Sequence, residues 1–189
     1  MDNILIQDLI EKLNKLPGVT KKTSIKIANF LITNPEYDIE SLIKSFESIK
    51  NNISICENCK YLKVANICKF CNSERVDFDS IMIVESINDV DKIEKTGIFC
   101  GRYFIWEFKP ENNKKLILQD REYKFINSFK NIILSLSPNL EGEVKSQYLI
   151  NIFKEKNISK LAIGLPFGSQ IDYIDEVTLK QAFNNRTKI

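Results

Sequence analysis

The sequence predicts a multi-module protein of mixed α+β and α/β class, with a helical N-terminal module, a small cysteine-rich module, an α/β sheet and a C-terminal tail. Three observations carry this prediction. Two helical patterns flank a Pro-Gly turn before residue 35, four cysteines lie between residues 56 and 71, and short apolar runs alternate with amphipathic segments after residue 80. Alternation of strand and helix signals is typical of a mostly parallel sheet.

Composition narrows the class of protein. The chain has 189 residues, 43% of them hydrophobic, which suits a soluble globular protein of one ordinary domain plus small modules. No apolar run reaches membrane-spanning length, and acids stand near the N-terminus where a signal peptide carries bases, so we expect a cytoplasmic protein without membrane contact. The net charge is only +2, so any contact with nucleic acid needs a local basic cluster.

The first module, predicted over residues 1–52, contains a pair of helices around the turn Leu16-Pro17-Gly18-Val19. Apolar residues recur with helical spacing before the turn and again after it, up to the Pro35 break, and a further short helix is expected over 39–49. These apolar residues are Ile6, Leu9, Ile10 and Leu13 before the turn, and Ile25, Ala28 and either Leu31 or Ile32 after it.

This turn resembles a helix-hairpin-helix, in which exposed backbone N–H groups and the start of the second helix face a phosphate. Lys15, Lys21, Lys22 and Lys26 cluster around the turn, and the last two, four residues apart, share a helix face. Such a site grips the DNA backbone without reading sequence. The turn alone leaves open a second interpretation, an ordinary helical hairpin whose lysines are solvated.

The second module, predicted over residues 53–76, is defined by Cys56-x2-Cys59 and Cys68-x2-Cys71, with eight residues between the pairs. Each Cys-x2-Cys turn can direct two sulfurs at one point, and two such turns complete the tetrahedral all-sulfur site typical of one structural Zn²⁺. The chain has no histidine, so a mixed site is excluded. Disulfides or plain buried thiols are weaker alternatives, because intracellular proteins rarely form disulfides and core cysteines rarely fall into two regular pairs.

The third module, predicted over residues 77–165, alternates strand and helix patterns. We expect buried strands at 81–84, 103–106, 132–136 and 161–164, and helices near 88–95, 122–130 and 144–153. Glu85 directly follows the first strand, and the carboxyl ends of parallel strands form the edge where open α/β sheets bind ligands.

Val84-Glu85-Ser86 and the later Glu141-Gly142-Glu143 resemble the Toprim domain of topoisomerases and primases. In the catalytic members an Asp-x-Asp helps to hold Mg²⁺, whereas the matching stretch of this chain, Ser137-Pro138-Asn139, is neutral. Mg²⁺ prefers several anionic oxygens, so Glu85, Glu141 and Glu143 would form a weak cation site at most. Glu141 and Glu143 have a second interpretation as favourable charges at a helix N-terminus.

The ordered set of motifs resembles the RecR family of bacterial recombination mediators over nearly the whole chain. Besides the hairpin turn, the four cysteines and the two Toprim-like motifs, the landmarks are Thr96-Gly97, Gly101-Arg102-Tyr103, Gly164-Leu165-Pro166-Phe167-Gly168 and Val177-Thr178-Leu179 up to Arg186. Each motif is short, but their order and spacing together are specific.

This resemblance implies a non-enzymatic DNA-binding protein of recombinational DNA repair. Family members form ring-like tetramers that can surround DNA, and they work with RecO, and often RecF, to place RecA on single strands. Their DNA contact is independent of sequence, on single-stranded or gapped duplex DNA. By the same resemblance, Lys22 and Lys26 would contact DNA, acidic positions such as Glu143 would face the partner protein, and residues 166–189 would hold the ring together.

The chain departs from the family pattern at several positions. Thr20 replaces the hairpin's second Gly, which predicts a turn less able to take positive φ. Ile87-Asn88 replaces a common Pro-Ala, and residues 107–121 are Lys/Asn-rich where a Gly-Pro-rich loop is usual. These departures affect partner surfaces more than the fold.

Two other functions compete with the mediator. A Mg²⁺-dependent Toprim nuclease or nicking enzyme would use Glu85, Glu141 and Glu143, but it lacks the Asp-x-Asp carboxylates and a tyrosine-bearing cleavage domain. A zinc-stapled adaptor that binds only proteins would have no salt-dependent affinity for DNA.

Overall fold

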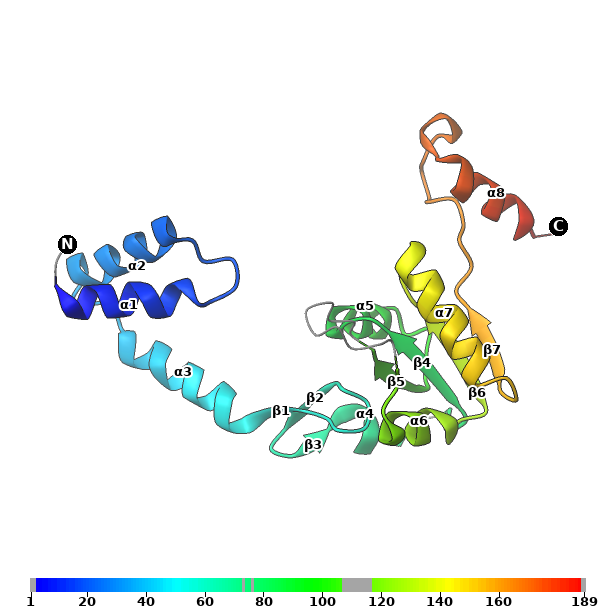
Figure 1. The fold of residues 1–189 in the computed structure, drawn as a ribbon, viewed down its shortest axis with the longest axis horizontal. Coiled ribbons are helices and arrows are strands. Elements are labelled where there is room, and N and C mark those ends of the chain that lie inside the picture. The colour runs from blue at the N-terminus through cyan, green and yellow to red at the C-terminus, as the bar shows by residue number, and fades with distance from the viewer. Residues whose placement is uncertain (1–2, 73, 76, 107–116, 188–189) are drawn as a thin grey trace. The chain divides into compact units, whose positions relative to one another are not determined.

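The structure is a computed structural model, and it describes residues 3–72, 74–75, 77–106 and 117–187. The chain forms two compact units, Met1–Lys50 and Asn51–Ile189 (Figure 1). Most of the Lys/Asn-rich stretch noted above lies outside the described residues. No helix in the described ranges is both long enough and apolar enough to cross a membrane.

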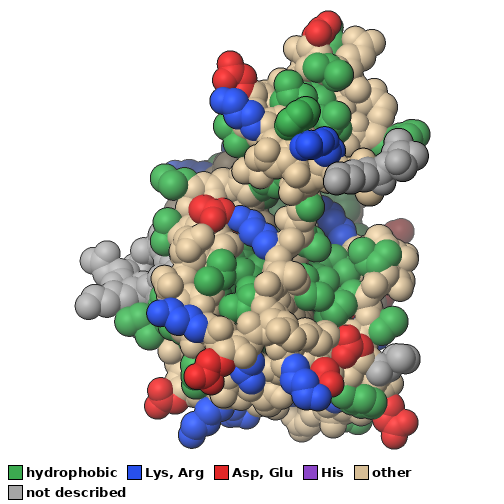
Figure 2. All heavy atoms as spheres, turned by 90° about the vertical axis from the view of Figure 1, so that its right-hand side faces the viewer, with side chains coloured by type: hydrophobic (Ala, Val, Ile, Leu, Met, Phe, Trp, Pro, Cys, Tyr) green, Lys and Arg blue, Asp and Glu red, His purple; other side chains and the backbone are tan. Residues whose placement is uncertain are grey.

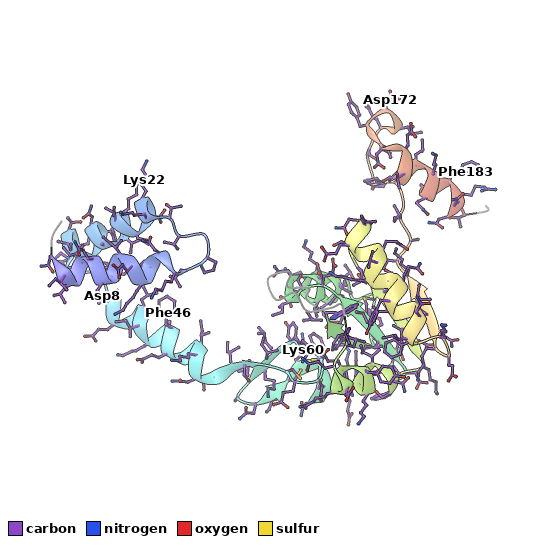
Figure 3. The ribbon with its side chains drawn as sticks, in the orientation of Figure 1. Asp8, Lys22, Phe46, Lys60, Asp172 and Phe183 are labelled. Carbon is purple, nitrogen blue, oxygen red and sulfur yellow. The ribbon has the colours of Figure 1, made fainter. Side chains whose placement is uncertain are left out.

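The first unit contains the predicted helical hairpin. Helix α1 (Ile4–Asn14) packs against α2 (Lys21–Thr33), where Ser24 and Ala28 are fully buried. The Ser24 hydroxyl donates a 2.6 Å hydrogen bond to the side chain of Asn14, which ties the two helices together. Helix α3 (Ile39–Asn52) follows and leaves apolar side chains exposed, among them Phe46, which projects from the helix in Figure 3.

The hairpin turn does not need a glycine at residue 20. Gly18 takes the positive φ of the turn, at +76°, which a residue without a Cβ adopts readily. Thr20 has an extended backbone with φ −86°, and its side chain accepts a hydrogen bond from the N–H of Thr23. Thr20 is therefore the N-cap of α2, and the expected weakening of the turn does not follow from its presence.

The cysteine-rich segment forms a small antiparallel sheet followed by one helical turn. Its elements are β1 (Ile53–Ile55), β2 (Leu62–Val64), β3 (Ile67–Cys68) and α4 (Lys69–Asn72), and the strand order is β1-β2-β3. Ala65 and Asn66 link β2 to β3, and both take positive φ, at 47° and 66°. Such a two-residue connection matches the twist of an antiparallel pair.

The larger sheet is parallel, as predicted. Its strands are β4 (Ser80–Val84), β5 (Arg102–Ile105), β6 (Asn131–Ser135) and β7 (Asn157–Lys160), in the order β5-β4-β6-β7. The crossover helices are α5 (Ile87–Thr96), α6 (Asp120–Asn127) and α7 (Leu140–Ile152). The mixed fold class, with helices, a parallel sheet and a four-cysteine cluster, is confirmed.

One predicted strand was misplaced. The apolar run 161–164 was expected to be a buried strand, whereas β7 is the polar stretch before it, and the chain has left the regular strand by Leu161. Strand β7 lies at the edge of the sheet, where only Ile158 needs to face the core. Strand β7 exposes three of its four side chains, so it lacks the continuous apolar signal of a central strand such as β4.

The two faces of the parallel sheet pack against different parts of the protein. Ile81, Ile83 and Phe104 pack on the face covered by α6 and α7, through Ile126 and Leu149. The alternate residues pack on the opposite face, against α5 and the cysteine module, and they are Met82, Val84, Tyr103 and Ile105. Because side chains alternate along a strand, the cysteine module forms one covering layer of the sheet.

The C-terminal segment carries exposed apolar side chains. A short 3-10 helix (Ile171–Tyr173) precedes α8 (Glu176–Asn184), whose first turn is capped by Asp175. Phe167, Tyr173 and Phe183 are exposed, and Figure 2 shows hydrophobic side chains gathered over this segment in the upper part of the view.

Candidate functional site

The four predicted cysteines come together in one cluster. Their sulfur atoms all lie within 4.8 Å of one another, with 3.7 Å between Cys56 and Cys71 and 3.4 Å between Cys59 and Cys68. All four are free thiols. Sulfurs at about 2.3 Å from a tetrahedral ion stand about 3.8 Å apart, so the cluster has the dimensions of a four-thiolate metal site. Three of the four side chains are buried and Cys71 is half-buried.

Backbone hydrogen bonds shape the first cysteine turn. The N–H of Lys60 donates to the carbonyl oxygen of Cys56 at 2.9 Å, and the N–H of Cys56 donates to that of Tyr61 at 2.6 Å. Lys60 takes a left-handed φ of 63°, which folds the chain back after Cys59. The second pair joins the end of β3 to α4, so both pairs direct their sulfurs inward.

The cluster favours one thiolate even before an ion binds. A hydrogen bond from Cys59 lowers the pKa of the Cys71 thiol to about 6, and Cys56, Cys68 and the positive charge of Arg102 act in the same direction. The hydrogen bond to Cys71 and burial raise the pKa of Cys59. Binding of a cation would release the remaining thiol protons, because metal ligands are thiolates.

Strand β5 of the parallel sheet holds both cysteine turns. Arg102 Nη1 donates hydrogen bonds of 2.7 Å to the carbonyl oxygens of Phe70 and Cys71. The backbone N–H of Ile105 donates to the carbonyl oxygen of Cys59 at 2.9 Å. Sequence reasoning noted Arg102 only as part of a family landmark and did not connect it with the cysteines. Nothing in the spacing of the cysteines points to a residue so distant in the chain.

A second connection joins the cysteine module to α5. Arg75 donates to both carboxylate oxygens of Glu94, at 2.8 and 3.3 Å, and its guanidinium lies over the rings of Phe70 and Tyr103. The Tyr103 hydroxyl donates to Glu94 at 2.8 Å. Burial alone would raise the pKa of Glu94, but the hydrogen bonds from Arg75 and Tyr103 hold it below its usual range. Glu94 is therefore a charged, paired carboxylate at neutral pH.

At the carboxyl edge of the parallel sheet, both oxygens of Glu85 accept hydrogen bonds from this chain. The backbone N–H of Ser137 donates to Glu85 Oε2 at 3.0 Å, and the Ser137 hydroxyl donates to the same oxygen. Lys145 Nζ donates to Glu85 Oε1 at 2.8 Å and lies 2.6 Å from Glu141 Oε1. Glu85 and Glu141 are thus brought together, with the ammonium of Lys145 between them.

Glu143, the third predicted acidic residue, pairs with a different lysine from Glu85 and Glu141. Glu143 pairs with Lys160 at the end of β7 and accepts a 3.4 Å hydrogen bond from Gln147. The hydrogen bond from Lys160 lowers the pKa of Glu143. In the described part of the chain, the four cysteines are the one group of at least three potential metal-ligating side chains that converge on a point. The role of Glu85, Glu141 and Glu143 as a partner surface or a weak cation site stays a prediction.

The hairpin lysines lie at the expected turn. Lys15 is the C-cap of α1, whereas Lys21, Lys22 and Lys26 lie in the first two turns of α2, and all four are exposed. Figure 3 shows Lys22 projecting outward from α2. The start of α2 carries the positive end of the helix dipole, so exposed lysines and backbone N–H groups share one region.

Comparison with known proteins agrees with these motifs. Residues 79–162 match the family model for the Toprim domain, and residues 164–187 match the model described as RecR, C-terminal. Proteins named recombination protein RecR are similar over nearly the whole chain. The one from Mycoplasmopsis pulmonis is 41% identical over 98% of this chain and 100% of its own length. That of Tropheryma whipplei is 34% identical over 98% of each chain, and that of Hydrogenovibrio crunogenus is 33% identical over 100% of each. The chain therefore belongs to the RecR family of recombination proteins.

Proposed function

We propose that this protein is a non-enzymatic, DNA-binding recombination mediator of cytoplasmic DNA repair. In this proposal it forms a ring-like clamp and acts with RecO, and with RecF where that protein is present, to load RecA on single-stranded DNA. The observation that carries the proposal is similarity to recombination protein RecR over at least 98% of the chain. The exposed hairpin lysines and the neutral Ser137-Pro138-Asn139 stretch support a protein that binds DNA without cutting it.

We propose that the first unit contacts DNA through Lys15, Lys21, Lys22 and Lys26. Four exposed ammonium groups around the start of α2 suit a phosphate backbone, because they carry charge but present no fixed pattern for reading bases. The expected contact is therefore independent of sequence, on single-stranded or gapped duplex DNA.

We propose that the four cysteines hold one structural Zn²⁺. A tetrahedral set of four thiolates is the donor set that Zn²⁺ takes in structural sites, and it leaves no open position for substrate. When bound, the ion supplies folding free energy to a segment too short to bury a core of its own. The cysteines position the ion, and Arg102 and Ile105 tie their turns to β5.

We propose that the C-terminal segment, 166–189, contributes to a homotetramer and that acidic residues such as Glu143 face the partner protein. Phe167, Tyr173 and Phe183 are exposed apolar side chains of the kind that oligomer interfaces bury. Glu143 lies on the exposed first turn of α7. The modules proposed for these roles are 1–52, 53–76, 77–165 and 166–189.

The first experiment titrates a gapped duplex with the purified protein at two salt concentrations, while the mass of the protein is measured in solution. The proposal expects an oligomer that binds in a salt-sensitive manner and leaves the DNA intact when Mg²⁺ is added. A monomer that ignores DNA would instead indicate an adaptor that binds only proteins. DNA cleavage that is lost in Glu85→Ala would assign the acidic edge to a nuclease.

A further inference from the structure

Lys145 lies in a position that is unusual for a charged residue. Among the residues that the structure describes, Lys145 is the one charged residue that is buried. Its side chain is only 3% exposed. A buried ammonium is costly unless it is paired with opposite charge and its protons are donated to acceptors. The surroundings of Lys145 must therefore be arranged to hold a cation.

Two carboxylates from different elements meet this requirement. Glu85 follows the central strand β4, whereas Glu141 lies in the first turn of α7, and one oxygen of each is within 2.8 Å of Lys145 Nζ. Burial alone would raise the pKa of Glu85 and lower that of Lys145. Hydrogen bonds from Lys145 and Ser137 outweigh burial at Glu85 and lower its pKa. Hydrogen bonds to Glu141 and Glu85 outweigh burial at Lys145 and raise its pKa. Glu85 and Lys145 are therefore both charged at neutral pH.

The second oxygen of Glu85 also has donors within this chain. This oxygen accepts from both the N–H and the hydroxyl of Ser137. The first turn of α7 packs directly on the backbone of Ser137. A Cβ at Gly142 would stand only 1.9 Å from the Ser137 carbonyl oxygen, so only glycine fits there. The side chain of Asn139 further fixes the turn by accepting the N–H of Gly142 at 2.8 Å. Both oxygens of Glu85 thus already have donors at a closely packed helix start.

We propose that the ammonium of Lys145 takes the place of a divalent cation at this sheet edge, so that the edge binds no Mg²⁺ and α7 is held to β4 by an internal counter-ion. One ammonium offsets part of the charge of two carboxylates and donates hydrogen bonds to both, as a bound cation would offset and bridge them. This inference does not depend on the mediator function proposed above, because it concerns ion binding by this chain alone.

The first test measures Mn²⁺ binding to the purified full-length protein from the electron paramagnetic resonance signal of free Mn²⁺. Mn²⁺ stands in for Mg²⁺, because both take oxygen ligands. The proposal expects no loss of free Mn²⁺ signal at the sheet edge, so that the wild type and Glu85→Gln give the same titration. A Mn²⁺ equivalent that binds to the wild type and is lost in Glu85→Gln would overturn the proposal.

The second test removes the ammonium. Lys145→Met keeps an unbranched side chain of similar length but leaves two carboxylates facing one another. Its Tm is expected to fall and then to rise by about 3 °C with Mg²⁺, relative to NaCl of equal ionic strength. The wild-type Tm should not respond to Mg²⁺. The matched control is Lys160→Met, which removes the partner of the more exposed Glu143 and should give no Mg²⁺ response.

A double variant completes the test. Glu85→Gln with Lys145→Met removes one charge of each sign and should abolish the Mg²⁺ response of the Tm. A response to Mg²⁺ in Lys145→Met no larger than in Lys160→Met would contradict the proposal. If Lys145→Met does not fold, the Mn²⁺ titration of the wild type against Glu85→Gln decides the matter alone.

Discussion

Arg102, on strand β5, donates a 2.7 Å hydrogen bond to the carbonyl oxygen of Cys71, so the parallel sheet holds one of the candidate metal ligands in place. The same nitrogen bonds the carbonyl oxygen of Phe70, and Ile105 on the same strand bonds that of Cys59. The cysteine segment and the sheet accordingly fall within one compact unit, Asn51–Ile189.

Replacing Arg102 should loosen the bound metal without removing a ligand. Arg102→Gln loses the charged donor to two carbonyl oxygens, and outer partners of metal ligands typically change affinity by about 10- to 100-fold. We expect zinc to pass faster to a chromophoric chelator, while the stoichiometry stays at one. Arg186→Gln, an exposed arginine on the C-terminal segment, is the control. Equal rates for the two variants would show that Arg102 does not support the site.

Removing a cysteine ligand should remove the metal. Cys59→Ser is expected to lose its zinc and to lower the Tm by about 5 °C or more, because the segment has little core of its own. Metal analysis and thermal unfolding measure both effects. Cys100→Ser, at an exposed thiol outside the cluster, should change neither. A Cys59→Ser protein with one equivalent of zinc and an unchanged Tm would contradict the four-cysteine site.

The hairpin lysines should contribute to the salt dependence of the DNA-binding constant. Each lysine–phosphate contact that is lost flattens the slope of log K against log[salt] by roughly 0.7 to 0.9. Lys22→Ala combined with Lys26→Ala should therefore weaken binding to all sequences alike and flatten the slope by about twice that amount. Lys180→Ala, on α8, is the control. An unchanged slope in the double variant would exclude both lysines from the DNA surface.

The Arg75–Glu94 pair should contribute to stability in a pH-dependent way. The pKa of Glu94 is lower in the folded protein than its ordinary value of 4.5. The ionised carboxylate therefore adds to the free energy of unfolding above about pH 4.5, and this stabilisation is lost as the pH falls through the folded pKa. Glu94→Gln should lower the free energy of unfolding at pH 7 and reduce its decline below pH 4.5. Urea unfolding from pH 7 to pH 3.5 measures both.

Glu176→Gln is the control for this prediction, because that side chain is 91% exposed and its lysine partner lies 3.8 Å away. It should leave the free energy of unfolding nearly unchanged at every pH. A pH profile of Glu94→Gln parallel to that of the wild type would mean that the ionisation of Glu94 does not contribute to folding.

The exposed apolar residues of the C-terminal segment should determine the state of assembly. Phe167→Ser is expected to lower the mass in solution at micromolar protein concentration, because its fully exposed ring would be buried in a symmetric interface. Light scattering measures the mass. Phe78→Ser removes an exposed phenylalanine outside this segment and should leave the mass unchanged. The same mass for both variants would place the interface elsewhere.

Local sequence patterns predicted the structure correctly where it depends on residues that are close together in the chain. The spacing of Cys56, Cys59, Cys68 and Cys71 predicted the cluster because two short turns determine where their sulfurs point. The central strand β4 was predicted because both of its faces are buried, which requires a continuous apolar run. The edge strand β7 was missed because exposure removes that signal.

The sequence by itself determined the class of fold, the four-cysteine cluster and the family. Only the tertiary structure decided which distant residues complete each site. Arg102 meets a carbonyl 31 residues away, and Lys145 meets Glu85 across 60 residues. Such pairs leave no periodic pattern in the chain, because their geometry arises from how a helix packs on a sheet. In the folded protein the acidic side chains at the carboxyl edge of the parallel sheet are paired with Lys145 and Lys160, which the sequence pattern alone did not predict.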